Sequence, residues 1–290
     1  MLKATQITLN TVQIQDSLLT IEAMLYQDDE IAPKANLIYL HGGGLLYGTK
    51  EDLPQLHLDT FSQAGLQIFA INYPLAPQAQ IEDIVNSILS SIEQLHNQPS
   101  FAELPYFLFG RSAGAYLALL TASKLNQQTD IKKPQGVISY YGYGFLTDSW
   151  FESPSPQYLK LPLVSESTFQ SLIATPSQEA DLKTHFSCYI YARQSGKWKS
   201  LIYQGRDKFF YIDYSLRLAE LNLPIFAAHA TNDPDVPFAE FQALCEKFNP
   251  TKFVIAAELH DFDRDEQSKD TWELIQATIN FIQNTWHDPC

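Results

Sequence analysis

The run Gly110-Arg111-Ser112-Ala113-Gly114 is the strongest structural signal in this chain; it follows Tyr106-Phe107-Leu108-Phe109 and precedes Tyr116-Leu117-Ala118-Leu119-Leu120. The pattern predicts a strand, a sharp turn that carries a serine, and a buried helix. Gly110 and Gly114 matter because side chains there would collide with the neighbouring strand and helix. The serine hydroxyl is then exposed above a helix N-terminus, which favours developing negative charge. This is a nucleophile elbow, although the motif by itself fits a small-residue helix start equally well.

A second glycine cluster, His41-Gly42-Gly43-Gly44, directly follows the strand-like run Asn36–Leu40. Such a loop brings backbone N–H groups close to a substrate carbonyl, and with the amide of Ala113 it would form an oxyanion hole. The alternative is a phosphate-binding loop, because Gly43 and Gly48 have the required spacing. That alternative fails because Thr-Lys follows Gly48, where phosphate binding needs Lys and then Ser or Thr.

A serine hydroxyl becomes a good nucleophile only when a base takes its proton. His260 is the best placed of the seven histidines, because it follows the strand-like run Phe253–Ala257 and precedes the last helical segment. Active sites of open α/β sheets gather at such strand ends. His229 lies in or at the end of the strand-like run Ile225–Ala228, and we interpret it as structural. The remaining candidates lie in helical patterns, in an inserted segment or near the end of the chain: His57, His96, His185 and His287.

Two carboxylates compete to orient the base, Asp233 and Asp235, in the turn Asn232–Pro237. We favour Asp233 because it comes first after the strand, whereas Asp235 is placed to face the N-terminal dipole of a helix that Pro237 opens. Three acids lie too close to His260 to be its obvious partner and read as a solvated acidic loop: Asp261, Asp263 and Asp265. The resulting order is serine, acid, histidine, which is that of the α/β hydrolases.

With these residues, the chain resembles the α/β-hydrolase superfamily, and within it the hormone-sensitive-lipase-like esterases that carry an HGGG loop. The likeness extends from about Asn36 to the end, except between the sixth and seventh strands. The four matching motifs are His41-Gly42-Gly43-Gly44, Tyr73-Pro74-Leu75-Ala76-Pro77, Gly110-Arg111-Ser112-Ala113-Gly114, and Asp233 to Pro237 with His260-Asp261-Phe262.

The resemblance implies a catalytic role for three side chains and three amides. Ser112 would be the nucleophile, His260 the base and Asp233 its orienting acid. The oxyanion hole would consist of the amides of Gly42, Gly43 and Ala113.

The chain departs from the family pattern at four positions, Asn72, Pro74, Arg111 and Ala115. Pro74 replaces the family's arginine and removes one buried ion pair. Arg111 would form a salt bridge with an acidic neighbour or, alternatively, lie near the mouth of the site and attract an anionic substrate group. These departures concern the subfamily more than the mechanism.

The alternation of strand-like and helical runs predicts an α/β-hydrolase fold, with a mostly parallel, doubly wound sheet. We expect an antiparallel edge hairpin from Thr5–Ile14 and Leu18–Leu25, and an amphipathic helix over Ile81–Leu95. Residues 1–144 and 222–290 would form the core, and the aromatic-rich residues 145–221 an inserted cap. The parallel strands are expected near residues 36–40, 67–71, 106–110, 136–141, 224–229 and 252–257.

A substrate pocket is expected between the cap and the core, because small-ligand sites are mostly apolar and lie between such units. The three residues that follow the glycines cannot lie far from the oxyanion hole. We therefore expect Leu45, Leu46 and Tyr47 to form part of the pocket wall.

Composition excludes several other classes of protein. The net charge of −14 argues against binding of nucleic acid or anionic membranes. No run approaches the roughly 18 apolar residues of a membrane span, and the N-terminus lacks an apolar signal region, so we expect a cytoplasmic protein. The scattered cysteines Cys188, Cys245 and Cys290 lack metal-ligand spacing and read as free thiols.

The expected function is hydrolysis of small carboxylic esters through an acyl-enzyme, with no metal and no organic cofactor. Two alternatives remain open. The same three side chains could hydrolyse amides, as in acylaminoacyl peptidases and arylformamidases. The fold could also serve as a non-catalytic receptor for a small ligand.

Overall fold

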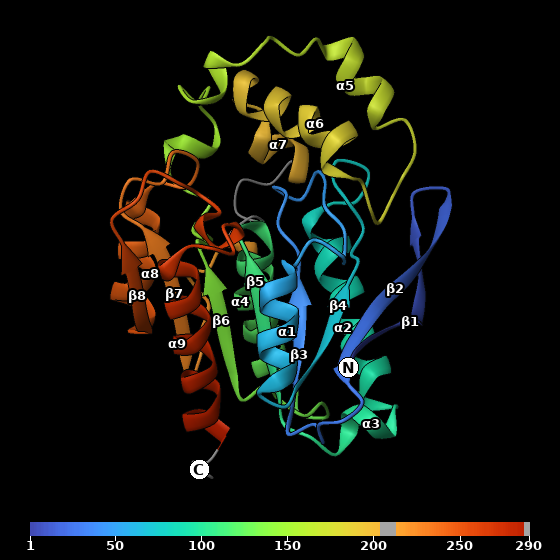
Figure 1. Cartoon of the computed structure of the whole chain (residues 1–290). Helices are drawn as coiled ribbons and strands as arrows, with labels where there is room; N and C mark the ends of the chain where they lie inside the picture. The colour runs from blue at the N-terminus through green and yellow to red at the C-terminus, as the bar shows by residue number, and fades with distance from the viewer. Residues whose placement is uncertain (204–212, 287–290) are drawn as a thin grey trace.

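An eight-stranded sheet forms the centre of the structure, a computed structural model that describes residues 1–203 and 213–286 (Figure 1). Its strands lie in the order β1-β2-β4-β3-β5-β6-β7-β8. Strand β2 is antiparallel to β1 and β4, and all other pairs are parallel. This confirms the mostly parallel, doubly wound sheet. The strands are β1 (Leu2–Ile14), β2 (Ser17–Asp28), β3 (Ala35–Leu40), β4 (Leu66–Ile71), β5 (Tyr106–Arg111), β6 (Gly136–Tyr140), β7 (Ile225–Ala230) and β8 (Thr251–Ile255).

The predicted N-terminal hairpin is confirmed, and both of its strands are longer than the sequence predicts. Pairing runs from Leu2 opposite Asp28 to Ile14 opposite Ser17, with a register shift after Thr8. The hairpin lies at one edge of the sheet, beside β4 (Figure 1).

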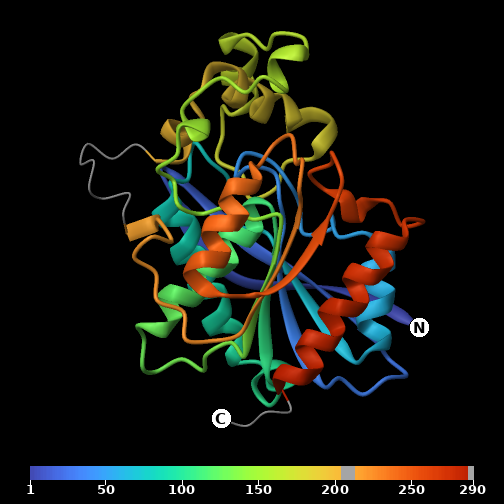
Figure 2. The ribbon, with the colours of Figure 1, turned by 90° about the vertical axis from the view of Figure 1, so that its left-hand side faces the viewer.

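Helices cover both faces of the sheet, as Figure 2 shows. On β3, Ile38 and Leu40 face the cluster that includes residues of α2, α4 and α8, whereas Leu37 and Tyr39 face the cluster formed with α1 and α9. This alternation is the two-residue period of a strand buried on both sides. The helices are α1 (Gln55–Gln63), α2 (Ile81–His96), α3 (Pro99–Ala102), α4 (Ala113–Asn126), α8 (Phe238–Phe248) and α9 (Lys269–Trp286).

The segment between β6 and β7 lies over the carboxyl ends of the parallel strands (Figure 1). Its described helices are α5 (Glu166–Leu172), α6 (Leu182–Ser195) and α7 (Trp198–Ile202). Aromatic rings join it to the core, since Phe186 and Tyr189 of α6 meet the ring of Tyr47, which follows β3, edge-on at centroid distances of 5.7 and 6.2 Å. We call this segment the cap; the boundaries 145–221 stay a prediction.

None of the helices in the described residues combines the length and the apolar character that a bilayer span requires. Of the residues considered above, His287 and Cys290 lie outside the described residues.

Candidate active site

The turn between β5 and α4 holds Ser112 in a rare backbone conformation, with φ 53° and ψ −117°. The Ser112 amide donates to the carbonyl of Tyr140 on β6 at 2.9 Å and so fixes the turn. A Cβ at Gly110 would lie 2.0 Å from the carbonyl oxygen of Gly114, and one at Gly114 would lie 2.0 Å from that of Leu40. The steric argument for both glycines is therefore confirmed.

Ser112, His260 and Asp233 are joined by hydrogen bonds, although they follow three different strands. His260 Nε2 lies 2.8 Å from Ser112 Oγ, and His260 Nδ1 lies 2.7 Å from Asp233 Oδ2. The second carboxylate oxygen of Asp233 accepts from the amides of Asp235 and Val236, at 2.8 and 3.0 Å. The three side chains named from the sequence thus form one chain from carboxylate to hydroxyl.

Burial and the neighbouring charge shift the pKa of His260 in opposite directions. Burial lowers the pKa of His260, but the Asp233 carboxylate opposes and outweighs it, and the net effect raises the pKa to about 9. For Asp233, burial raises the pKa, and the charge and hydrogen bond of His260 hold it below its ordinary value. An ionised Asp233 keeps a proton on Nδ1, which leaves Nε2 of the neutral ring to accept the serine proton.

The glycine loop after β3 is held from two sides. The hydroxyl of Tyr73 donates to the carbonyl of His41 at 2.8 Å, and the two rings stack with centroids 4.1 Å apart. The amides of Leu46 and Tyr47 donate to the carbonyl of Gly43, which has φ +105°. A Cβ at Gly43 would lie 1.9 Å from the carbonyl oxygen of Tyr47, so only glycine fits there.

Three amides beside Ser112 remain available to a ligand. No hydrogen bond among residues 1–203 and 213–286 has the amide of Gly42, Gly43 or Ala113 as its donor. Gly42 contacts the nucleophile turn, since a Cβ at Gly42 would lie 3.5 Å from that of Ser112. Unpaired amides at such a place can stabilise an oxyanion.

The cavity at Ser112 is small, with a volume of about 40 Å³. Pockets for drug-sized ligands measure roughly 300–1,000 Å³, so this one admits only a few atoms beside the serine. Tyr47 and Tyr189 line it together with charged side chains, among them Asp235 and Arg264. This part of the pocket thus has a mixed lining, with charged groups beside tyrosine rings, and the apolar wall expected from the cap stays a prediction.

Of the three residues expected to form the pocket wall, only Tyr47 lines the cavity. Leu45 and Leu46 are not among its lining residues; both are buried in the core cluster. The backbone turns at Leu45, which has φ 66°, and its carbonyl accepts from the Ala76 amide. Proximity in sequence to the glycines therefore did not determine where these two side chains point.

The Asp235 carboxylate is bonded to the cap, whereas the sequence predicts that it faces the N-terminus of the helix after Pro237. Pro237 does precede α8, but the Asp235 carboxylate accepts hydrogen bonds from the hydroxyl of Tyr189 at 3.0 and 3.1 Å. Arg193 of the cap donates to the Asp235 carbonyl at 3.2 Å. One Asp235 oxygen lies 4.0 Å from His260 Nε2. Asp235 therefore lines the site and links it to the cap.

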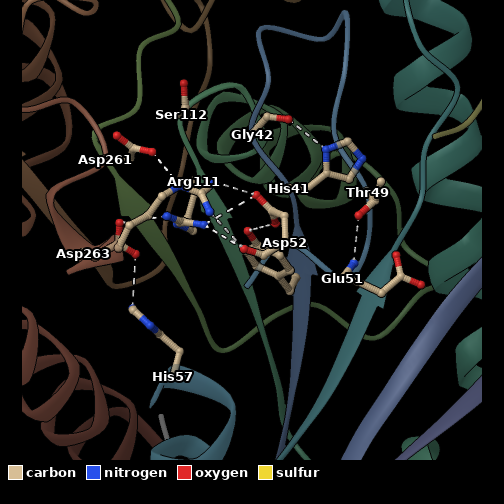
Figure 3. Close-up of polar contacts among 12 residues, drawn as sticks. His41, Gly42, Thr49, Glu51, Asp52, His57, Arg111, Ser112, Asp261 and Asp263 are labelled. Carbon is tan, nitrogen blue, oxygen red and sulfur yellow. Dashed lines mark hydrogen bonds and ion pairs between the residues drawn. The ribbon is translucent and has the colours of Figure 1, made fainter. Parts of the chain in front are cut away.

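The prediction of a solvated acidic loop after His260 is wrong for Asp263. Asp261 and Asp265 are exposed, but Asp263 is buried and accepts from Arg111 at 2.9 Å and from the Tyr141 hydroxyl at 2.7 Å. Arg111 is itself buried, which favours the salt-bridge interpretation of that residue (Figure 3). Sequence reasoning missed Asp263 and Tyr141, because nothing distinguishes Asp263 from its two exposed neighbours along the chain.

The other described histidines do not contact Ser112. His229 lies on β7, where its Nε2 donates to the carbonyl of Val236 at 3.1 Å, and burial lowers its pKa to about 4. His57 and His96 lie on α1 and α2, and His185 lies on α6 of the cap. Within the described residues, no group of three or more histidine, cysteine, aspartate or glutamate side chains could hold a metal ion.

Comparisons with known proteins agree with the fold described above. The chain belongs to the alpha/beta hydrolase fold family, whose sequence model matches residues 37–212. A protein with unknown function from Staphylococcus aureus subsp. aureus Mu50 superposes with a TM-score of 0.81 at 24% identity, covering 97% of this chain and 99% of its own. An alpha/beta hydrolase superfamily protein from Enterococcus faecalis gives a TM-score of 0.78 at 22% identity, covering 96% and 99%.

A thermophilic carboxylesterase cloned from a metagenomic library is also similar, with a TM-score of 0.68 at 16% identity and coverage of 98% and 89%. At these identities the likeness establishes the fold, which is the predicted α/β-hydrolase fold.

Proposed function

We propose that this protein is a serine-dependent carboxylesterase of the HGGG type that hydrolyses esters with short acyl groups. One observation carries the proposal: Ser112, His260 and Asp233 are hydrogen-bonded in series beside the unpaired amides of Gly42, Gly43 and Ala113. A nucleophile, a base, an orienting acid and an oxyanion hole are the complete requirement for acyl transfer.

The first half-reaction would acylate the serine. His260 Nε2 takes the proton from Ser112 Oγ as the oxygen attacks the ester carbonyl. The amides of Gly42, Gly43 and Ala113 stabilise the negative oxygen of the tetrahedral intermediate; loss of one such donor typically costs roughly 2.7–4 kcal/mol. His260 then gives its proton to the leaving alcohol.

In the second half-reaction, water attacks the acyl carbon while His260 takes a proton from it. The bond between the acyl group and Ser112 Oγ then breaks, His260 returns the proton to Oγ, and the carboxylic acid leaves. Asp233 stays ionised throughout and stabilises the imidazolium form of His260, in keeping with its lowered pKa. The small cavity beside Ser112 supports an acyl group of only a few atoms.

The test is hydrolysis of p-nitrophenyl esters from acetyl to decanoyl by the wild-type protein and by Ser112→Ala. We expect kcat/KM to be highest for the shortest esters and to fall by roughly 10⁶-fold in the variant. Ser100→Ala, at an exposed position on α3, is the matched control and should retain full activity.

The outcome separates the alternatives. Equal hydrolysis by Ser112→Ala would refute the serine mechanism. Inactivity of the wild-type protein on every ester would refute the esterase proposal; amide substrates would then be tested with the same pair of proteins.

A further inference from the structure

A buried carboxylate lies beneath the proposed active site and takes no part in the mechanism above. Asp263 has no exposed surface, and the charge of Arg111 together with its neighbours holds the pKa of Asp263 far below its usual range, against the effect of burial. Removing a charge from water is costly, and a buried ion pair often adds little to stability. The arrangement of this pair therefore calls for another explanation.

The two hydrogen-bond donors to Asp263, Arg111 and Tyr141, belong to different segments of the proposed active site. Arg111 precedes Ser112 in the chain, and its Nη2 donates to Asp263 at 2.9 Å. Tyr141 follows Tyr140, whose carbonyl accepts the Ser112 amide, and its hydroxyl donates to Asp263 at 2.7 Å. Asp263 itself lies on the loop that carries His260. One carboxylate thus joins the ends of β5 and β6 to the histidine loop.

Of Arg111, Tyr141 and Asp263, Tyr141 is the residue whose ring contacts the ring of His260. Its ring meets the His260 ring at an interplanar angle of 62°, with centroids 4.7 Å apart. Its hydroxyl accepts from Arg111 Nε at 2.7 Å while donating to Asp263, so the ring is fixed at its far end. Tyr141 has φ 41°, and its amide donates to the carbonyl of Ala228 at 2.7 Å. The ring is therefore held by backbone and hydroxyl together.

Arg111 has no nitrogen left without a partner. Nε donates to the hydroxyl of Tyr141. Nη2 donates to Asp263, and Nη1 donates to the carbonyl and carboxylate oxygens of Asp52 at 3.4 and 3.5 Å (Figure 3). Every guanidinium nitrogen thus already donates to a protein group, which argues against recognition of an anionic substrate by Arg111. On the other side of Asp263, His57 Nε2 lies 3.2 Å from its second oxygen.

We propose that Asp263, Arg111 and Tyr141 form a positioning network, in which hydrogen bonds through Asp263 keep His260 at hydrogen-bonding distance from Ser112. The inference rests on the proposed function, because it concerns the same nucleophile and base. Directional bonds from three segments fix their relative placement, which apolar contacts would not. A misplacement of about 1 Å at such a site costs roughly 10²-fold in rate.

The decisive variant is Tyr141→Phe, which removes the hydroxyl shared by Arg111 and Asp263 but keeps the ring against His260. We expect kcat for p-nitrophenyl acetate to fall roughly 10- to 100-fold with KM unchanged. Tyr143→Phe is the matched control, since the buried Tyr143 hydroxyl has no hydrogen-bond partner among the described residues. That control should retain the wild-type kcat.

Labelling with a fluorophosphonate measures the reactivity of Ser112 without reference to any substrate. The second-order rate of labelling should fall in Tyr141→Phe by the same factor as kcat, and the final labelled fraction should equal that of the wild-type protein. The opposite result is that the folded Tyr141→Phe protein reacts at the wild-type rate while a smaller part of the sample is folded and becomes labelled. That result would mean that the hydroxyl supports only folding, and it would overturn the network.

Asp263→Asn supplies a second measurement. It keeps the shape of the side chain and removes the charge, and the double variant with Tyr141→Phe should lose less activity than the product of the two single losses. Independent, multiplicative losses would contradict a shared network. If Asp263→Asn does not fold, Tyr141→Phe decides alone.

Absence of labelling in the wild-type protein would refute the proposed function itself, whereas a labelled wild type with equally reactive variants would refute only the network.

Discussion

The indole Nε1 of Trp198 donates a hydrogen bond to the carbonyl oxygen of Gly44 at 2.8 Å, so the cap directly holds the last glycine of the loop that follows β3. Tyr189 adds a second link. Its ring lies so close to Gly44 that a Cβ there would come within 2.2 Å of it, while its hydroxyl bonds to Asp235. The cap therefore contacts both the glycine loop and the loop that carries Asp233.

Replacing Trp198 by phenylalanine should test the link between cap and loop. Trp198→Phe removes one buried hydrogen bond and retains an aromatic ring, and we expect kcat/KM for p-nitrophenyl acetate to fall about two- to ten-fold, the equivalent of about 0.5–1.5 kcal/mol. Steady-state kinetics measures the change. Trp272→Phe, at an exposed site on α9, is the control, and an equal loss in both variants would contradict the assignment.

Gly114 should tolerate no side chain. In Gly114→Ala the new Cβ would lie 2.0 Å from the carbonyl oxygen of Leu40 and 2.5 Å from that of His41, so β3 or α4 must move. We expect the free energy of unfolding to fall by at least about 3 kcal/mol and hydrolysis to be lost. Ala115→Gly, one position further along the helix, should cost only about 1 kcal/mol. Urea unfolding compares the two, and similar costs would refute the steric argument.

The sequence predicts the sheet well because its signals are local. Each parallel strand is a short apolar run, and the observed strands begin and end within a few residues of the predicted ones. Gly110 and Gly114 stand where another backbone segment comes so close that only glycine fits. The sequence predicts Ser112 and His260 as site residues because each follows a parallel strand, and the carboxyl ends of these strands are where active-site side chains gather.

What the sequence could not predict depends on contacts between distant segments. Asp263 lies in the same acidic run as two exposed carboxylates, but it is buried against Arg111 and Tyr141, which lie 152 and 122 residues away in the chain. Asp235 finds its partner Tyr189 on a helix of the cap. Leu45 points into the core because the backbone turns there with φ 66°. None of these contacts leaves a periodic or local signal in the chain.

The pH dependence of hydrolysis should follow the raised pKa of His260. The base must be neutral, so kcat/KM, which reports the free protein, should rise with pH and level off above about 9. Asp235→Asn removes a negative charge near Nε2 that raises this pKa, and the plateau should be reached at lower pH. Initial rates between pH 6 and 10, corrected for spontaneous ester hydrolysis, give the profile.

The control for that profile is Asp29→Asn, which removes the same charge from the turn after β2, far from the site. Its profile should coincide with that of the wild-type protein. A plateau that stays in place or moves to higher pH in Asp235→Asn would contradict the role assigned to its carboxylate.

Acid should destabilise the fold through His229. Burial lowers its pKa to about 4, whereas a histidine in the unfolded chain titrates near 6.5, so the unfolded state binds more protons between these values. Stability should be highest above about pH 6.5 and should decrease by about 3 kcal/mol on acidification through this window to pH 4. His229→Gln keeps a donor for the Val236 carbonyl but cannot titrate, so its loss between pH 7 and pH 4 should be smaller by that amount. Urea unfolding at the two pH values measures the difference, with His185→Gln in the cap as the control. An equal loss in the wild-type protein and His229→Gln would assign the acid sensitivity to other groups.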